Sequence, residues 1–492
     1  MSKIIQIVLF FMPLIGFSQK DTIAHLYTFG GDRNDNAEEI QATSDGGYIV
    51  IGSTSSNSWG NTDAYLLKVD SLCSYQWSKA LGDNNNEWGY SIKQTFDKGY
   101  IIAATSNSYG NGGYDAVLMK RDSLGNYEWT KVYGGIDWDI AYSVVQTYDS
   151  GYVFCGETYN NTNGFSDVYI VKTNPLGDTL WTRTYGGSLI DKGNSVIETS
   201  DSNIVVAGIS NTLTDSTDIY VIKLTANGTL IWDSVYGGIL YETANQLIET
   251  NDGDYAIIGG TSSVDPGVDE SIYLFKIDLN GNFLWQQTYG YDVNTPGKND
   301  EGVGIKEMMN GDLVLLSKAE KHGAGLHDIS LIRVNSGGWW LGVAITIGSS
   351  NEEIPNSITI GLNGNILIAG KTIVQSNEEV LLLRIDTIYP GMDTIINSYM
   401  DMIPLNIVSK EEDNFMYLLY PNPAESFIKI NTMIDYHTSQ HRIIIHDVFG
   451  RSVYETEYYG GDIFVENLKQ GIYFFSLLNE DKIVFRNKFL KQ

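Results

Sequence analysis

The central part of the chain repeats itself about every 52 residues, and this period constrains the fold more than any other feature. Each repeat carries an aromatic or aliphatic residue followed by glycine. The successive glycines are Gly30, Gly82, Gly134, Gly186, Gly237, Gly290 and Gly348, with spacings of 52, 52, 52, 51, 53 and 58 residues. Seven such anchors predict seven copies of one structural unit.

Four short segments in each repeat alternate apolar and polar residues, which is the period of a strand with one buried face. In the third repeat they cover residues 140–147, 152–157, 168–173 and 180–184. Turns rich in Asp, Asn and Gly separate them, as between Asp149 and Gly151, and we expect these residues to supply caps and positive φ. One four-stranded sheet per repeat with no helical period is typical of a β-propeller blade, with a solenoid as the main rival. The sequence therefore predicts an all-β fold with a seven-bladed β-propeller over residues 19–400.

Two segments compete to close the ring. Residues 25–29, before the first anchor, align with residues 129–133 of the fourth segment in a later repeat. Residues 393–400 could take the same place in the last blade. The N-terminal segment is the preferred choice, and the alternation of side chains leaves both open.

Two residue types recur once per repeat as columns of structural side chains. A tryptophan column lies in the fourth segment: Trp77, Trp129, Trp181, Trp232 and Trp285. A basic column lies in the third: Lys68, Lys120, Lys172, Lys223, Lys276, Arg333 and Arg384. We expect the tryptophans to fill the wedge between neighbouring sheets. The basic side chains should lay their stems on apolar surface and pair with nearby acids.

An acidic column stands five residues before an apolar first-segment position in every repeat: Asp35, Glu87, Asp139, Asp191, Glu242, Asp300 and Glu353. Carboxylates one blade apart do not bring together the roughly six to eight nearby oxygens that Ca²⁺ prefers. We therefore predict no metal. Each carboxylate is expected to cap N–H groups of its own interblade loop, or to pair with the basic column.

Exposed aromatic residues mark a candidate binding surface. In an up-and-down blade, the interblade loops and the loops between the second and third strands share one face, and variable loops on a rigid scaffold usually carry binding. The candidates there are Trp59, Trp88, Tyr109, Trp138 and Tyr241. Aromatic rings among Asn, Asp and Gly suit a glycan or a protein ligand, although packing within the loops is an equal alternative.

Composition excludes some functions. With 60 acidic and 31 basic residues the formal charge is -29, so we expect no nucleic acid partner, because phosphate would be repelled. None of the six histidines belongs to a His-Glu-x-x-His arrangement, and no Gly-x-Ser-x-Gly turn is present. We predict a non-catalytic binding or adhesion protein, with a secreted carbohydrate-active enzyme on the same loop face as the alternative.

The N-terminus resembles an export signal. Residues 1–18 combine Lys3, an apolar run and small residues at Gly16 and Ser18, which predicts a cleavable signal peptide rather than a transmembrane segment. The two cysteines, Cys73 and Cys155, lie in different repeats, so we expect no disulfide between them.

The C-terminal region starts after a charged linker at residues 401–414. Residues 415–492 contain several short alternating segments, which predict a small β-sandwich. Three motifs occur in order, and they include Pro421, Asn422, Pro423, Asp447, Gly450, Gly471 and Tyr473. These motifs resemble the type A C-terminal sorting domain of type IX secretion cargo. The resemblance implies an Ig-like sandwich, recognition by the type IX secretion machinery, and a secreted product that is extracellular or attached to the outer membrane surface.

The repeats themselves resemble the secreted β-propeller repeats that are often fused to such domains. The stretch from Asp122 to Trp129 is also similar to the tryptophan docking motif of quinoprotein dehydrogenases. It departs from that motif by lacking a Thr-Gly-Lys stretch and by belonging to seven repeats instead of eight. We therefore expect no quinone or other cofactor.

Overall fold

The computed structural model divides into two compact units, residues 1–403 and 404–492. It describes residues 3–7, 24–56, 58–160, 162, 165–211, 216–263, 270–290, 299–320, 326–349, 351–374, 376–386, 393–395, 418–420, 427–431, 441–447, 451–458, 463–479 and 482–491. Within these ranges all regular elements are β-strands or isolated bridges. The predicted linker at residues 401–414 lies outside them, as does all of the predicted signal peptide except residues 3–7.

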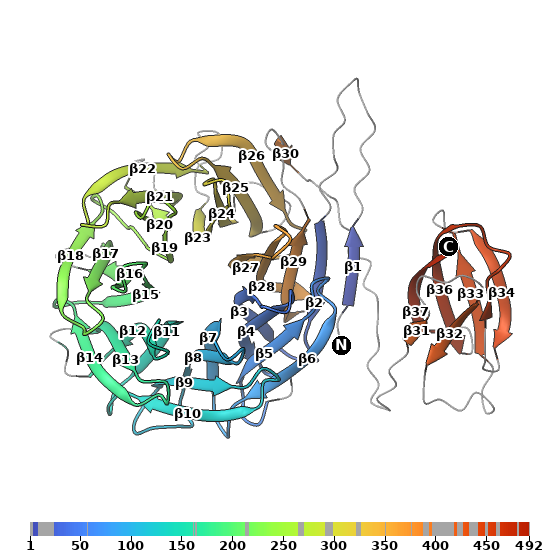
Figure 1. Cartoon of the computed structure of the whole chain (residues 1–492), viewed down its shortest axis with the longest axis horizontal. Helices are drawn as coiled ribbons and strands as arrows, with labels where there is room; N and C mark the ends of the chain where they lie inside the picture. Colours follow the sequence, from blue (N-terminus) through green and yellow to red (C-terminus); the bar gives the residue numbers. More distant parts are fainter. Residues whose placement is uncertain are drawn as a thin grey trace. The chain divides into compact units, whose positions relative to one another are not determined.

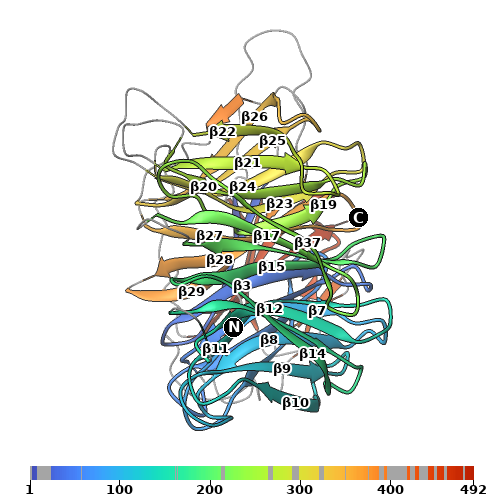
Figure 2. The same cartoon turned by 90° about the vertical axis from the view of Figure 1, so that its left-hand side faces the viewer.

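The first unit is a ring of seven antiparallel sheets, with the first strand of each sheet innermost (Figure 1). Figure 2 shows the ring from its side, with loops at both faces. Blade 1 contains β3 (Asp35–Ala42), β4 (Tyr48–Thr54), β5 (Asp63–Val69) and β6 (Tyr75–Leu81), and blade 2 contains β7 (Glu87–Gln94), β8 (Tyr100–Ser106), β9 (Asp115–Arg121) and β10 (Tyr127–Tyr133). Blade 3 contains β11 (Asp139–Gln146), β12 (Tyr152–Thr158), β13 (Asp167–Thr173) and β14 (Thr179–Tyr185). Blade 4 contains β15 (Asp191–Glu198), β16 (Ile204–Ser210), β17 (Asp218–Leu224) and β18 (Leu230–Tyr236). The predicted seven-bladed propeller is confirmed.

The last three blades include the closure of the ring. Blade 5 contains β19 (Gln246–Glu249), β20 (Tyr255–Thr261), β21 (Ser271–Ile277) and β22 (Phe283–Tyr289). Blade 6 contains β23 (Asp300–Glu307), β24 (Leu313–Ala319), β25 (Asp328–Val334) and β26 (Trp340–Ile347), with β30 (Asp393–Ile395) at its edge. Blade 7 contains β27 (Glu353–Ile360), β28 (Ile366–Val374), β29 (Asn377–Ile385) and β2 (Ala24–Phe29), and β1 (Lys3–Ile7) pairs along β2. The N-terminal strand β2 thus supplies the fourth strand of blade 7.

The competing segment at residues 393–400 does not close the ring. Its described part, β30, pairs parallel to β26 at the outer edge of blade 6. In contrast, β2 pairs antiparallel with β29 from Ala24 opposite Ile385 to Phe29 opposite Val380. Leu26 and Phe29 are buried in the hydrophobic clusters on the two sides of blade 7. An apolar strand that buries both of its faces gains more hydrophobic free energy than a short strand at an outer edge. This explains why β2, and not β30, closes the ring.

The tryptophan column fills the space between blades, as predicted. The Trp77 ring meets Tyr100 of the next blade at 6.2 Å between centroids in an edge-on arrangement. A Cβ on Gly125, in the next blade's last turn, would lie 2.7 Å from the Trp77 ring, and Gly125 has φ 76°. Glycine is therefore required there both for the turn and for contact with the indole.

The tight turns between first and second strands place positive φ on unexpected residues. Blade 1 uses Gly46 there, with φ 83°, whereas blades 2, 3 and 4 use Lys98, Ser150 and Ser202, with φ between 61° and 67°. The preceding aspartate stabilises the turn, since the Gly99 N–H donates to Asp97 Oδ1 at 2.9 Å. The expectation that Asp, Asn and Gly alone supply positive φ was wrong for these blades.

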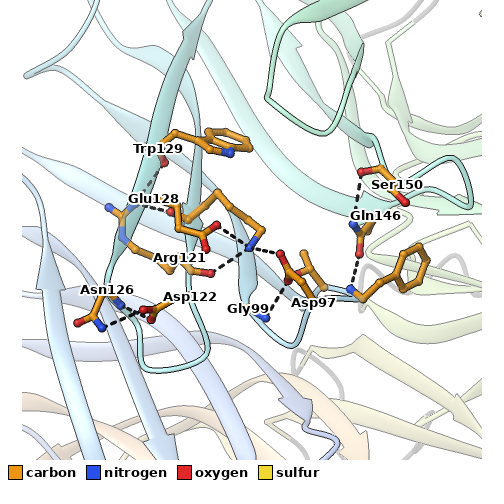
Figure 3. A network of polar contacts seen from close by, with 12 residues as sticks. Asp97, Gly99, Arg121, Asp122, Asn126, Glu128, Trp129, Gln146 and Ser150 are labelled. Carbon is orange, nitrogen blue, oxygen red and sulfur yellow. Dashed lines mark hydrogen bonds and ion pairs between the residues drawn. The ribbon is translucent and has the colours of Figure 1, made fainter.

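The basic column is buried, with side chains between 2% and 8% exposed. Its members in blades 1 to 6 pair with aspartates of these turns, whereas Arg384 of blade 7 pairs with Asp386. In blade 2, Lys120 Nζ lies 3.0 Å from Asp97 Oδ2 and 2.9 Å from Glu128 Oε2, and donates to the Arg121 carbonyl at 3.2 Å (Figure 3). Burial of the stem with local pairing of the amine matches the prediction. In blades 1 to 6 these pairs connect the third strand to the turn between the first and second strands.

The second unit contains a three-stranded and a four-stranded sheet. The first sheet has the order β31 (Leu418–Tyr420), β32 (Phe427–Asn431) and β35 (Ile463–Phe464), and the second has β34 (Ser452–Tyr458), β33 (His441–His446), β36 (Gly471–Asn479) and β37 (Lys482–Lys491). Side chains of both sheets share one core, including Ile428, Ile443 and Phe475. Two sheets around one apolar layer form the predicted sandwich.

Candidate functional site

The acidic column is structural. All seven carboxylates are 4% exposed or less. Glu87 shows the pattern: one oxygen accepts the Asp83 N–H of its own interblade loop at 2.9 Å, and the other accepts the Ser106 hydroxyl at 2.6 Å. The column therefore caps the interblade loops, which was one of the two expected roles. The cations of the basic column bind other carboxylates: turn aspartates in blades 1 to 6 and Asp386 in blade 7.

A second carboxylate lies beside the column at several blade junctions. Asp63 is fully buried, and its Oδ1 has no hydrogen-bond partner. A Cβ on Gly82 would lie 2.5 Å from this atom and 2.3 Å from Glu87 Oε2, so the two carboxyl groups face each other across the glycine. Burial and the nearby Glu87 raise the pKa of Asp63. The sequence analysis missed this partner, although its counterparts Asp115, Asp167, Asp218 and Asp328 recur with the same period.

These carboxyl pairs give the stability a pH dependence with a definite sign. Burial and Asp139 raise the pKa of Asp115 to about 6, whereas an unfolded aspartate has a pKa of about 3.9. The folded protein therefore holds this proton more tightly than the unfolded chain, so acidification from about pH 7.5 to about pH 5 stabilises the fold. We expect the thermal unfolding midpoint, followed by circular dichroism, to rise by a few degrees over this range.

An Asp115→Asn variant is the matched control, because it removes this proton uptake and should flatten the rise. In stronger acid the effect of pH on stability reverses, and further acidification destabilises the fold. Although partial burial raises it, hydrogen bonds from Thr43 and Gly47 and the Lys68 ammonium lower the pKa of Asp45 to about 2. Its stabilising contribution is fully present above the unfolded pKa of about 3.9 and is lost as the pH falls from there through the folded pKa of about 2. A midpoint that decreases steadily from about pH 7.5 downwards would contradict the assignment.

Four aromatic side chains from blades 2 and 3 form a continuous strip on the loop face, the face that carries the interblade loops. Ring centroids are separated by 5.2 Å for Trp88 and Tyr114, 5.2 Å for Tyr114 and Trp138, and 6.2 Å for Trp138 and Tyr159. Trp138 is 49% exposed and the other three are half-buried. We call these four residues the aromatic strip. The structure thus brings together two of the five predicted binding residues and adds two tyrosines.

The strip is held by the backbone of the loops. The Asp139 N–H donates to the Tyr114 carbonyl at 2.7 Å, and the Tyr159 N–H donates to the Trp138 carbonyl at 2.8 Å. A Cβ on Gly113 would lie 2.1 Å from Trp138 Cδ1, so the indole rests directly on glycine backbone. The rings are therefore preorganised, which lowers the entropic cost of binding.

The other three predicted aromatics lie elsewhere. Tyr109 is half-buried against the core between blades 1 and 2, so loop packing explains it. Tyr241 is 53% exposed and belongs to the loop that precedes blade 5. Trp59 is 80% exposed on blade 1.

Trp59 borders a cavity of about 420 Å³ at the junction of blades 7 and 1. The cavity walls combine aromatic rings with hydroxyl groups, one carboxylate and one amine. They are formed by Phe29, Gly30, Gly31, Asp35, Thr54, Ser56, Trp59, Tyr65, Tyr75, Ser78, Lys79 and Ala80. A volume in this range is typical of small-molecule sites, which span about 300–1,000 Å³.

The C-terminal motifs stabilise the sandwich where the structure describes them. Asp447 Oδ1 accepts the Arg451 N–H at 3.0 Å, and Asp447 Oδ2 accepts Arg451 Nε at 2.8 Å, which closes the turn between β33 and β34. The Tyr473 hydroxyl donates to the Lys469 carbonyl at 2.9 Å, next to Gly471 at the start of β36. Pro421, Asn422, Pro423 and Gly450 lie outside the described residues.

Two features are absent from the described part of the chain. No helix there is long and apolar enough to cross a membrane. No group of three or more His, Cys, Asp or Glu side chains in the same part is arranged to hold a metal ion. Cys73 and Cys155 are both buried free thiols, and burial raises the pKa of Cys73 to about 12.

Similarity to solved structures is distant. The chain is 10% identical to the Neurospora crassa Pan2 WD40 domain, covering 73% of this chain and 91% of that one with a TM-score of 0.45. It is 12% identical to Porphyromonas gingivalis PorZ, a surface component of the type-IX secretion system, covering 91% and 69% at 0.38. Puromycin hydrolase is 11% identical, covering 90% and 59% at 0.47. At these scores the likenesses carry no argument about activity, and no curated protein matches the chain.

The C-terminal unit matches a known protein family. Residues 418–492 match the secretion system C-terminal sorting domain, the same segment in which the three motifs and the sandwich occur. This domain directs its cargo to the cell surface or the extracellular space through type IX secretion. Residues 418–492 are therefore a type IX secretion C-terminal sorting domain, and the chain is an exported protein whose passenger is a seven-bladed β-propeller.

Proposed function

We propose that the exported propeller is a binding or adhesion protein without catalytic activity, and that it attaches to carbohydrate through the aromatic strip. The observation that carries the proposal is the unbroken contact of four rings on the loop face. Aromatic faces stack well on the C–H faces of sugar rings, and Trp and Tyr add N–H and O–H groups for their hydroxyls.

The environment of the carboxylates supports a non-catalytic role. Glycoside hydrolysis requires two carboxyl groups on either side of a bound sugar. The seven carboxylates of the acidic column are instead buried, and Glu87 and Glu242 accept N–H groups of their own interblade loops. These carboxylates therefore stabilise the loops of the propeller itself.

A glycan array with the full chain tests the proposal. We expect wild-type protein to bind a subset of glycans, and a Trp88→Ala/Trp138→Ala variant to lose at least about tenfold in affinity, because hot-spot aromatics contribute about 2 kcal/mol or more each. The matched control is Phe96→Ala/Tyr148→Ala. These rings are 64% and 63% exposed on the tight turns of the same two blades, at the opposite face, and their loss should leave binding unchanged.

Four outcomes would contradict the proposal. Absence of glycan binding would remove carbohydrate as the ligand, and capture of a peptide through the same strip would replace it. Equal losses in the two double variants would show that the strip is not the site. Release of reducing sugar from a bound glycan would contradict the non-catalytic role.

A further inference from the structure

At the cavity between blades 7 and 1, blade 1 lacks a side-chain pair that blades 4 and 5 have. In blades 4 and 5, a tyrosine of the third strand donates its hydroxyl to a longer side chain on the fourth strand: Tyr220 to Asp233 Oδ2 at 2.6 Å, and Tyr273 to Gln286 Oε1 at 2.7 Å. The equivalent tyrosine in blade 1 is Tyr65. The position that Asp233 and Gln286 occupy, immediately after the column tryptophan, holds only Ser78 in blade 1, opposite Leu67 and diagonal to Tyr65.

The short Ser78 leaves space that Asp233 and Gln286 fill in their own blades. Its hydroxyl lies between two phenols, hydrogen-bonded to Tyr65 and 3.3 Å from the Tyr75 hydroxyl. Tyr65 is half-buried, whereas Tyr220 and Tyr273 are more deeply buried, at 8% and 6% exposure. The small side chain of Ala80 widens the same wall.

The preceding blade also contributes a difference at this junction. In blades 2, 4 and 5 the anchor tyrosine donates its hydroxyl to a glycine carbonyl in the next blade, as Tyr133 does to Gly177 at 2.6 Å. Blade 7 has Phe29 at this position, which has no hydroxyl. The junction between blades 7 and 1 is thus bordered by the phenyl ring of Phe29, which carries no polar group.

The polar atoms of the cavity are already oriented. Asp35 accepts the Gly31 N–H at 2.7 Å and the Ser56 hydroxyl at 2.6 Å on one oxygen, and Thr54 donates to the other. A carboxylate offers about four acceptor positions, so one remains for a ligand hydroxyl. Lys79 Nζ donates to Asn126 Oδ1 at 3.2 Å and retains further donors.

The loop that carries Trp59 is fixed while its indole is free. The Trp59 N–H donates to Asp63 Oδ2 at 2.9 Å, yet the residue is 80% exposed. A large ring held by its backbone and exposed to solvent at the border of a cavity is placed to cover a flat ligand.

We propose that this cavity binds a single sugar ring, the terminal unit of a neutral glycan, between the rings of Tyr65, Tyr75 and Trp59. The proposal rests on the proposed carbohydrate-binding function and names a second subsite for it. A pyranose has an apolar C–H face for the aromatic rings and a rim of hydroxyls for Ser56, Ser78 and Asp35. The nearby carboxylate disfavours an anionic sugar, since like charges repel.

The experiment measures binding of a panel of neutral methyl hexopyranosides and N-acetylhexosaminides to the full chain by saturation-transfer NMR and by Trp fluorescence titration. The decisive variant is Ser78→Gln, which gives blade 1 the Tyr–Gln pair of blade 5 and fills the cavity. We expect at least a tenfold loss of affinity with an unchanged unfolding midpoint. The matched control Thr182→Gln makes the same change at the equivalent, exposed position of blade 3, and should bind like wild type.

A Tyr75→Ala variant keeps the test decisive if Ser78→Gln folds poorly. Tyr75 is 47% exposed, so its removal should weaken sugar binding at least about fivefold without affecting the core. Absence of binding by wild type, or unchanged affinity in both variants, overturns the proposal. If glycan binding is lost in the Trp88→Ala/Trp138→Ala variant but unaffected by Ser78→Gln, the cavity proposal fails alone. If binding is lost with Ser78→Gln but is unaffected in the Trp88→Ala/Trp138→Ala variant, the cavity proposal stands and the aromatic strip is not the binding site.

Discussion

Deletion of residues 24–29 is expected to abolish cooperative folding of the propeller. This strand, β2, buries Leu26, Tyr27 and Phe29 to 7% exposure or less. Burial of three such side chains contributes about 5–9 kcal/mol at about 1.5–3 kcal/mol each, which is comparable with the whole net stability of a typical domain, about 5–15 kcal/mol. Deletion also leaves β29 as an open sheet edge, which promotes aggregation. Loss of the thermal transition by calorimetry would be the signature.

Two further variants show whether the effect belongs to this strand. Leu26→Ala removes part of one buried side chain and should cost about 2–5 kcal/mol, which lowers the midpoint without abolishing the transition. Deletion of residues 393–395 removes the other segment that competed for this position. Because β30 adds only three residues to an outer edge, its loss should shift the midpoint by less than that of Leu26→Ala. Equal effects of the two deletions would show that β2 does not close the ring.

Deletion of residues 415–492 is expected to leave a folded propeller inside the cell envelope. The chain divides into separate compact units before and after residue 403, so the passenger retains its own core. The sorting domain at residues 418–492 is the part that the type IX machinery recognises. We expect at least a tenfold decrease of the protein at the cell surface and in the medium, measured by fractionation and immunoblotting.

The point variant Asp447→Ala makes the same test within the intact length. It removes the carboxylate that accepts two hydrogen bonds from Arg451, and should reduce export through the altered turn. The periplasmic protein from either variant should retain the wild-type unfolding midpoint of the propeller. Arrival of the truncated chain outside the cell at wild-type levels would contradict the assigned role of the domain.

Periodicity predicted most of the fold because it reports an average over seven copies. The anchors located every blade, and the alternation in residues 140–147 and 152–157 located strands within a residue or two. The closing strand was ambiguous because residues 25–29 and 393–400 carry similar local patterns. Only the burial of Leu26 and Phe29 between two clusters distinguishes them, and burial depends on contacts that are distant in sequence.

The candidate site was less predictable, since exposure of an aromatic ring depends on its neighbours. Trp88 and Trp138 were found by their position beside the acidic column, but Tyr114, which connects them, precedes a strand and gives no distinct signal. Tyr109 had the same loop context as Trp59 and nevertheless packs against the core. Comparison of Ser78 with Asp233 and Gln286 across the repeats was the available signal for the cavity.

The closure by β2 also imposes an order of events on synthesis. His25 and its contact Asp386 are 361 residues apart, so β2 cannot pair until the last strand of blade 7 has been synthesised. Earlier blades can form in sequence, but the toroid stays open until the seventh has emerged. Such long-range pairing slows folding, so blade 7 is the last part of the propeller that can be completed during synthesis.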